Sequence, residues 1–435
     1  MRSRRDRGAL RAPPRHVRVL LLTDIPPSTN YSGGIHLAQL CRHLPKGALD
    51  IFAILNPNLA PTIPADLSSI PIHYTEKPNE YAWRRGSRIA ANAGAFLSES
   101  YRAATARRRV GDEAVRHVRN TRPDVVWCLL EGQTMIQVGA RVRRHTDASF
   151  VTQVMDPPGW WLNEHGLDRL SRRRVSSLFD GVVRASDRCG TASWAMADVY
   201  RTRYSVETVP LVPSIDESEV PAGTSAVRDS SRVLVVALAG QIYAHDAWAA
   251  LVSSLDGVGW RIDGRRVALR LFGLSDWGRE LALRAVPPTS LLPEHVEFSE
   301  WRPQGETLGL LAECDILYCP YWFGAEFEEE ARLSFPSKLT TYLAVGRPVL
   351  FHGPAYSSPA VFLEREKAGV CCTSLEPAAV LGALTTIATD GELRATVTTN
   401  GRRAWQEQLS VDAQRAAFAR FLGVEEDFLA NGHRA

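Results

Sequence analysis

The sequence lacks several features that would mark a membrane-spanning or metal-centred protein. None of its apolar runs approaches the roughly 20 residues that a helix needs to cross a bilayer. It has no Cys-x-x-Cys pair, and its seven cysteines show no framework spacing. We therefore expect buried free thiols in a reducing compartment, a cytoplasmic location and no zinc site.

The sequence also has little net charge, because its 51 basic residues are nearly balanced by 48 acidic ones, which leaves +3. This excess is too small to indicate a nucleic-acid partner. The positive charge is mostly arginine, and six arginines lie within residues 1–16. This leader has no apolar run, so it is not a secretory signal, and we expect a disordered tail. The alternative is a role in targeting or at a membrane surface.

The 435 residues show two successive patterns of short apolar strands separated by helices. Such alternation predicts an α/β fold with two doubly wound parallel sheets. We expect domains at 17–212 and 232–400, and terminal helices at 401–435 that pack back on the first domain. The stretch 213–231 is polar and rich in Pro, Gly and Ser, as in a linker. One of the expected strands in the first domain spans Gly181–Ala185.

A glycine pair follows the first strand, in the run 32–36. Gly33 and Gly34 allow a tight turn and a close approach of the backbone, and the following helix offers its N-terminus to a phosphate. His36, next to them, is a candidate contact for a sugar or acceptor. The alternative interpretation is an ordinary connection between a strand and a helix.

The run 335–349 contains a second candidate phosphate site. Pro336 favours a helix start, Gly346 favours a helix end, and Ser337 and Lys338 lie in the first helical turn. A helix N-terminus, a hydroxyl and an ammonium together form a strong anion site. The alternative is an ordinary helix with a solvated lysine.

A third cluster, in the run 155–161, follows the end of a strand. Asp156 could hold sugar hydroxyls or act in catalysis, while Trp160 and Trp161 stack on a sugar ring. The alternative is that Asp156 only caps a helix.

The run 336–349 resembles the Pro-Ser-Lys-Leu-x-Glu/Asp-Tyr-Leu-Ala-x-Gly-x-Pro-Val signature of the glycosyltransferase family 4-like group. Weaker similarities, in the same order as in the family, extend over about residues 17 to 425. The resemblance implies the GT-B architecture, in which two Rossmann-like domains face a central cleft. It also implies a retaining glycosyltransferase that uses a nucleotide-diphosphate sugar, with the run 336–349 around the diphosphate and ribose.

The sequence departs from the family pattern at several positions. The acidic pair of the family would fall at Leu333 and Thr341, and Thr341 can offer the ribose only a hydroxyl. After Gly240, which matches the start of the donor domain, Gln241 stands at the position of an arginine and His245 near that of a lysine. One acid of the run 326–330 could reach the site, or the run could be a solvated loop.

Three functions agree with the sequence: a glycosyltransferase, a nucleotide-sugar epimerase of the same architecture, and a catalytically silent binding subunit. No Asp-x-Asp motif is present, so we expect no cofactor and no metal. A UDP- or GDP-sugar is the expected donor, and the acceptor is a glycan, a lipid-linked sugar or a small molecule. The arginine runs 107–109 and 172–174 could contact a membrane surface peripherally or form solvated helix faces.

Overall fold

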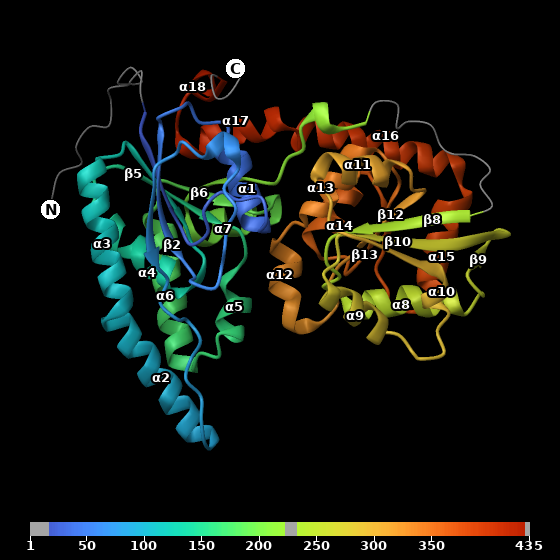
Figure 1. Ribbon diagram of the computed structural model, residues 1–435, viewed down its shortest axis with the longest axis horizontal. Helices are drawn as coiled ribbons and strands as arrows, with labels where there is room; N and C mark the ends of the chain where they lie inside the picture. Colours follow the sequence, from blue (N-terminus) through green and yellow to red (C-terminus); the bar gives the residue numbers. More distant parts are fainter. Residues whose placement is uncertain (1–16, 222–232, 431–435) are drawn as a thin grey trace. The chain divides into compact units, whose positions relative to one another are not determined.

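The computed structural model describes residues 17–221 and 233–430 (Figure 1). The expected basic leader and the second part of the expected linker, 222–231, lie outside the described residues. The chain divides into two compact units, which we describe separately. The first unit comprises residues up to Gln153, then 168–189 and the end of the chain from Phe418. The second comprises 154–167 and 190–417.

The first sheet has seven strands in the order β3-β2-β1-β4-β5-β6-β7. Its strands β1, β2, β4 and β5 are almost wholly buried and pair in parallel, which explains their apolar sequences. The elements from β1 to β7 are β1 Val19–Thr23, α1 Ser32–Cys41, β2 Leu49–Leu55, η1 Ala65–Leu67, β3 Ile72–Glu76, α2 Arg88–Ala104, α3 Ala106–Thr121, β4 Val125–Leu129, α4 Gly132–Arg143, β5 Ser149–Val154, α5 Pro158–Glu164, α6 Arg169–Ala185, β6 Arg188–Thr191, α7 Trp194–Tyr204 and β7 Glu207–Pro210.

One predicted strand of this sheet is wrong. Residues 181–185 are the last turn and a half of helix α6, and the strand β6 begins only at Arg188. The apolar residues Val182 and Val183 are buried from a helix rather than from a strand. A short apolar run fits either element, and here it continues the helix that starts at Arg169, where the Asp168 side chain caps the first turn.

The second sheet has seven strands in the order β11-β10-β8-β12-β13-β14, with the short β9 paired to β10. Its elements and those after it are η2 Glu217–Glu219, β8 Val233–Ala239, α8 His245–Asp256, β9 Arg261–Ile262, β10 Arg265–Phe272, α9 Asp276–Arg284, α10 Leu292–His295, β11 Val296–Ser299, α11 Gln304–Ala312, β12 Ile316–Pro320, η3 Ala325–Phe327, α12 Glu328–Leu333, α13 Ser337–Val345, β13 Val349–His352, α14 Ser358–Glu366, β14 Val370–Cys372, α15 Pro377–Thr389, α16 Gly391–Gln408, α17 Val411–Leu422 and α18 Glu426–Ala430.

Helices cover both faces of the second sheet (Figure 1). Alternate residues of β8 enter different cores: Leu234 and Leu238 pack with α8 and α15, while Ala237 packs with α11, α13 and α16. This period of two, with both faces apolar, explains the near-continuous apolar run of the strand. The doubly wound α/β prediction is confirmed for the two parallel sheets.

The end of the chain contributes to the core of the first unit. Phe418 and Phe421 of α17 pack edge-on against Trp127 of β4, with ring centroids 5.1 Å and 6.1 Å away. The Arg188 guanidinium of β6 also donates to the Phe421 carbonyl. Both contacts lie within this unit.

Candidate functional site

In both sheets the first strand lies centrally, with the strand order reversing beside it, between β1 and β4 and between β8 and β12. Ligands of open α/β sheets bind outside the carboxyl ends of the strands at such switch points. In the second sheet, the loop after β8 begins with Gly240 at φ +80°, a conformation that favours glycine. This loop turns the chain toward α8.

Helix α13 begins beside this loop. Its first residue is Ser337, no side chain caps its N-terminus, and it ends at Gly346 in the left-handed conformation, so the predicted helix bounds are confirmed. The buried Tyr342 hydroxyl accepts a hydrogen bond of 2.8 Å from the Ala239 backbone, which fixes the helix against the end of β8. The backbone N–H groups of the first turn therefore stand at the switch point, where they suit an anion.

Lys338 carries the positive charge at this helix start. Its Nζ donates to the Gln241 carbonyl at 2.8 Å and lies 5.6 Å from the centre of the Tyr243 ring. Burial lowers the pKa of the Lys338 ammonium. The bond to Gln241 uses one of three donors, so the ammonium can serve both the loop and an anionic ligand.

Gln241 and His245, the two side chains after β8 that were expected to hold the diphosphate, point to other partners or to solvent. The Gln241 amide donates to the Gly273 carbonyl at 3.2 Å and accepts from the Ser275 hydroxyl at 3.3 Å. His245 is exposed at the start of α8, where Asp246 adds a negative charge to the first turn. This arrangement favours α13 over α8 as the phosphate-binding helix.

Asp156 lies two residues beyond β5 and belongs to the second unit. Its Oδ1 accepts a hydrogen bond of 2.9 Å from the Ser334 hydroxyl, three residues before α13. Burial raises the pKa of the Asp156 carboxyl, although this hydrogen bond opposes the rise. The fold thus brings Asp156 next to the segment that leads into the candidate phosphate site.

Glu330 is the acid of the run 326–330 that becomes buried, whereas Glu326, Glu328 and Glu329 are exposed. Burial raises the pKa of the Glu330 carboxyl, and the negative charges of Glu329 and Asp156 raise it further. The run is helical rather than a solvated loop, because it forms η3 and α12. The sequence indicated only that one of the four acids in this run could reach the site. No neighbouring residue distinguishes Glu330 from the other three.

The two adjacent tryptophans of α5 differ sharply in how far their side chains are exposed to solvent. Trp160 is 41% exposed, whereas Trp161 is 3% exposed and its ring centroid lies 6.0 Å from that of His165. A stacked sugar needs an open ring face, which Trp160 has and Trp161 lacks. The stacking role therefore remains a prediction for Trp160, and Trp161 is placed as a core residue.

At the two positions where the family carries acids, the side chains have structural roles. Leu333 is buried, and its carbonyl accepts a hydrogen bond of 2.5 Å from the Ser193 hydroxyl. The Thr341 hydroxyl donates weakly, at 3.4 Å, to the Ser337 carbonyl one turn earlier in α13. Neither residue replaces a carboxylate.

The glycine pair lies within the first turn of α1, which begins at Ser32, and not in the loop before the helix where the sequence placed it. A Cβ on Gly34 would overlap the Ser28 hydroxyl, and the Gly34 carbonyl accepts from the Ser28 backbone at 3.0 Å. The packing of this loop therefore accounts for Gly34 without a ligand. Gly33 is half-buried in the first turn, and His36 is buried on the same helix.

A buried charged cluster, which sequence reasoning missed, lies beyond the ends of β1 and β3. Lys77 pairs with Asp24 at 2.9 Å and with Glu80 at 3.0 Å, and Glu80 also accepts from the Thr134 backbone at the start of α4. Burial alone would lower the pKa of Lys77, but the two carboxylates outweigh it and raise the pKa. Lys77 and Glu80 are three positions apart, but Asp24 is 53 positions from Lys77, so the sequence does not show the cluster as a motif.

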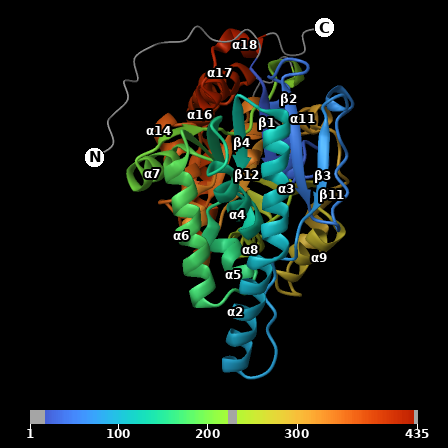
Figure 2. The same ribbon diagram turned by 90° about the vertical axis from the view of Figure 1, so that its left-hand side faces the viewer.

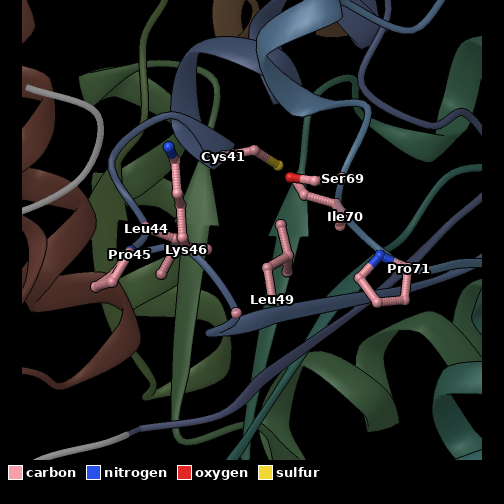
Figure 3. A pocket seen from close by; sticks show the side chains of 9 residues that line it. Cys41, Leu44, Pro45, Lys46, Leu49, Ser69, Ile70 and Pro71 are labelled. Carbon is pink, nitrogen blue, oxygen red and sulfur yellow. The ribbon is translucent and has the colours of Figure 1, made fainter. Parts of the chain in front are cut away.

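Two hollows differ in what they could accept. In the first unit, a small pocket of about 30 Å³ lies at the amino end of β2, beside Cys41, Leu49 and Pro71 (Figure 3). That volume suits about one water. In the second unit, a hollow of about 440 Å³ is lined by Gly159, Asn163, Val199, Ala325, Glu326, Glu328, Glu329, Glu330, Arg332 and Leu333. Its four glutamates make it unsuited to a nucleotide diphosphate.

The expected surface of arginines 107–109 needs a correction. Arg107 is buried and forms a bidentate ion pair with Glu99, so only Arg108 and Arg109 face solvent. In the second run, Arg172 is half-buried, and Arg173 and Arg174 are exposed.

No helix in residues 17–221 and 233–430 is long and apolar enough to cross a membrane. Within those residues, no three His, Cys, Asp or Glu side chains form a group that could hold a metal ion.

The two parallel sheets, each with helices on both faces, define the GT-B fold of glycosyltransferases, as the resemblance implied. The chain is similar to HepE of Anabaena in complex with UDP and glucose, with a TM-score of 0.62 and 15% identity over 94% of this chain and 100% of HepE. Sucrose-phosphate synthase of Thermosynechococcus elongatus matches with a TM-score of 0.59 and 13% identity over 93% and 98% of the two chains.

A third similar structure is the N-terminal domain of the Candida albicans trehalose-6-phosphate phosphatase, with a TM-score of 0.64 and 13% identity over 98% of each chain. Neither protein-family models nor curated protein sequences gave a match. At these identities the similarity establishes the fold and leaves the activity to the residues of the site.

Proposed function

We propose that this protein is a glycosyltransferase that moves a sugar from a nucleotide-diphosphate sugar to an acceptor, without a metal and with retention at the anomeric carbon. The observation that carries this proposal is the uncapped start of α13 with Lys338 beside it at the switch point of the second sheet. The similarity to HepE, whose structure contains UDP and glucose, supports a UDP-sugar as the donor.

The proposed mechanism relies on stabilising the leaving diphosphate. Glycosyl transfer passes through an oxocarbenium-like state, and negative charge develops on the departing phosphate oxygen. The first-turn N–H groups of α13 and the Lys338 ammonium would stabilise that charge without rearranging, since Tyr342 and Gln241 already hold them in place. Ser337, which is exposed in the same turn, can donate its hydroxyl to the phosphate.

Asp156 is assigned to the sugar side of this site. Its carboxyl is held by Ser334, whose segment runs directly into α13, so Asp156 and Lys338 are fixed relative to each other within one unit. A carboxyl group can accept hydrogen bonds from sugar hydroxyls. Trp160 is the aromatic surface available nearby in the sequence, and Thr341 can offer a hydroxyl to the ribose.

The test is calorimetric binding of UDP and uridine to the wild type and to Lys338→Met. We expect UDP affinity to fall by about 1.5–3 kcal/mol in the variant, or roughly 10- to 150-fold, because a charge-assisted hydrogen bond is lost. Uridine lacks the phosphates, so its affinity should not change.

The matched control is Lys367→Gln, which removes a charge from an exposed site on the same unit. Equal loss of UDP and uridine binding in Lys338→Met would indicate general damage instead of a phosphate contact. Unchanged UDP affinity would remove Lys338 from the site, and no stabilisation by any nucleoside diphosphate or its sugar would refute the proposal.

A catalytically silent nucleotide-binding subunit is the second candidate. The side chains at Leu333 and Gln241 favour it, since one packs in the interior and the other bonds to the loop after β10. The two candidates are separated by incubating the protein with UDP-glucose and looking for UDP release and a glycosylated product. Binding without either product would support the silent subunit, and interconversion of sugars without an acceptor would indicate an epimerase.

A further inference from the structure

Large apolar side chains are unusually exposed in one segment of the first unit, residues 81–104, which we call the α2 hairpin. It consists of helix α2 and the loop that leads into it, and Figures 1 and 2 show it extending beyond the end of α6. Within 21 residues it exposes Tyr81, Trp83, Ile89, Phe96, Leu97 and Tyr101. Ile89 is 84% exposed and Tyr101 is 71% exposed.

These apolar residues share one face of α2. Ile89, Phe96, Leu97 and Tyr101 follow helical spacing, and together they form an apolar stripe that points away from the buried Ala95 and Glu99. A helix of a globular protein normally buries its apolar face. Here the buried stripe is narrow, and the wide apolar face is directed to solvent.

The exposed charged side chains of the α2 hairpin are all arginines. Arg84, Arg85 and Arg88 are exposed at its tip. The one acid within residues 81–104 is Glu99, which is buried in an ion pair with Arg107, with N···O distances of 2.5 Å and 2.9 Å. The exposed side chains of residues 81–104 therefore combine apolar and aromatic groups with arginines and include no carboxylate.

The hairpin loop is fixed onto α2 and approaches it closely at Gly94, where a Cβ would lie 3.0 Å from the Trp83 carbonyl oxygen. The Trp83 backbone donates to the Ser98 hydroxyl at 3.2 Å, the Arg84 guanidinium donates to Asn92 at 3.2 Å, and Arg102 bonds to the Tyr81 carbonyl. These contacts keep the indole and phenol rings at the surface beside the arginine cluster.

We propose that the α2 hairpin docks on an anionic lipid surface, with the apolar face of α2 in the interface and the arginines among the headgroups. Tyrosine and tryptophan favour the boundary between headgroups and acyl chains, and arginine gains from anionic lipid. A second copy of this chain is disfavoured as the occupant, because it would bring two clusters of arginines together without a balancing acid. The surface is independent of the proposed nucleotide site.

The experiment is flotation of the full chain with phosphatidylcholine vesicles and with vesicles that also contain phosphatidylglycerol. We expect binding to the anionic vesicles that weakens with added salt, and little binding to the neutral ones. Replacing Arg84, Arg85 and Arg88 with Gln should lower the partition onto anionic vesicles by about fivefold per arginine, or roughly hundredfold for the three. Trp83→Ser with Ile89→Ser and Leu97→Ser should abolish binding.

The control of matching composition is Trp277→Ser with Leu283→Ser and Leu291→Ser, which replaces one exposed tryptophan and two exposed aliphatic side chains on the second unit. This variant should bind the vesicles like the wild type. Equal binding to neutral and anionic vesicles, or equal loss in both triple variants, would overturn the proposal. A dimer in solution that the Trp83 variant dissociates would assign the surface to a second copy. Because UDP binding is measured separately, failure here leaves the proposed function untouched.

Discussion

The ion pair between Glu99 and Arg107 provides a stringent test of how α2 is attached to the first unit. The two side chains are 2% and 1% exposed, and they meet through two contacts at 2.5 Å and 2.9 Å. Glu99→Gln keeps the shape but removes the one carboxylate that is hydrogen-bonded to the buried Arg107 guanidinium, and leaves it only the more distant charge of Glu80. Breaking such a buried pair costs about 3–5 kcal/mol. For a unit of this size, we expect the melting temperature to fall by roughly 10 °C.

The measurement is thermal and urea unfolding followed by circular dichroism and tryptophan fluorescence. Glu99→Leu combined with Arg107→Met replaces both charges with apolar groups and should recover most of the loss, since the penalty of the isolated charge is gone. Glu280→Gln, which breaks the exposed pair with Arg284 in α9, is the control and should cost under about 1 kcal/mol. If the single variant is as stable as the wild type, or the double variant as damaged as the single one, the reasoning is refuted.

Three further outcomes follow from the contacts. Burial raises the pKa of Glu330 above its usual 4.5, so the protonated form stabilises the fold at low pH and that contribution is lost as pH rises through the folded-state pKa. Glu330→Gln should therefore raise the melting temperature at pH 7 and leave it unchanged near pH 4. Tyr342→Phe leaves a buried N–H at the end of β8 unpaired and should cost about 1–3 kcal/mol in urea unfolding. Gly34→Ala should cost about 1–3 kcal/mol through overlap with Ser28, whereas Gly181→Ala, in an open helical site, should stabilise by about 0.5–1 kcal/mol, as paired melting curves can show.

The features that could be predicted from sequence are those set by neighbouring residues. The start and end of α13 follow from Pro336 and Gly346, whose backbone preferences act locally. The apolar strands of both sheets follow from burial on two faces, which leaves a continuous run such as that of β8. Where the local pattern fits two elements, as at residues 181–185, the five apolar-rich residues alone were insufficient, and the continuous helix from Arg169, capped by Asp168, is the observed outcome.

The features that could not be predicted depend on residues distant in the sequence. Glu330 differs from Glu328 and Glu329 only because one side of α12 faces the region of Asp156, 174 positions earlier in the numbering. The Lys77 cluster likewise depends on Asp24, 53 positions away, which the parallel order of β3, β2 and β1 brings to the same edge of the sheet.

The arginine runs show why composition is a poor guide to a surface. Three consecutive arginines at 107–109 predicted a basic helix face, yet the first is the buried partner of Glu99. That pairing removes the one acid of the α2 hairpin from solvent, whereas Arg84, Arg85 and Arg88 stay exposed at its tip. The same ion pair that stabilises the base of α2 therefore also sets the sign of the surface that α2 presents. A variant that separates these effects, Glu99→Leu with Arg107→Met, should keep the attachment of α2 and its binding to anionic vesicles, because the exposed Arg84, Arg85 and Arg88 are unchanged.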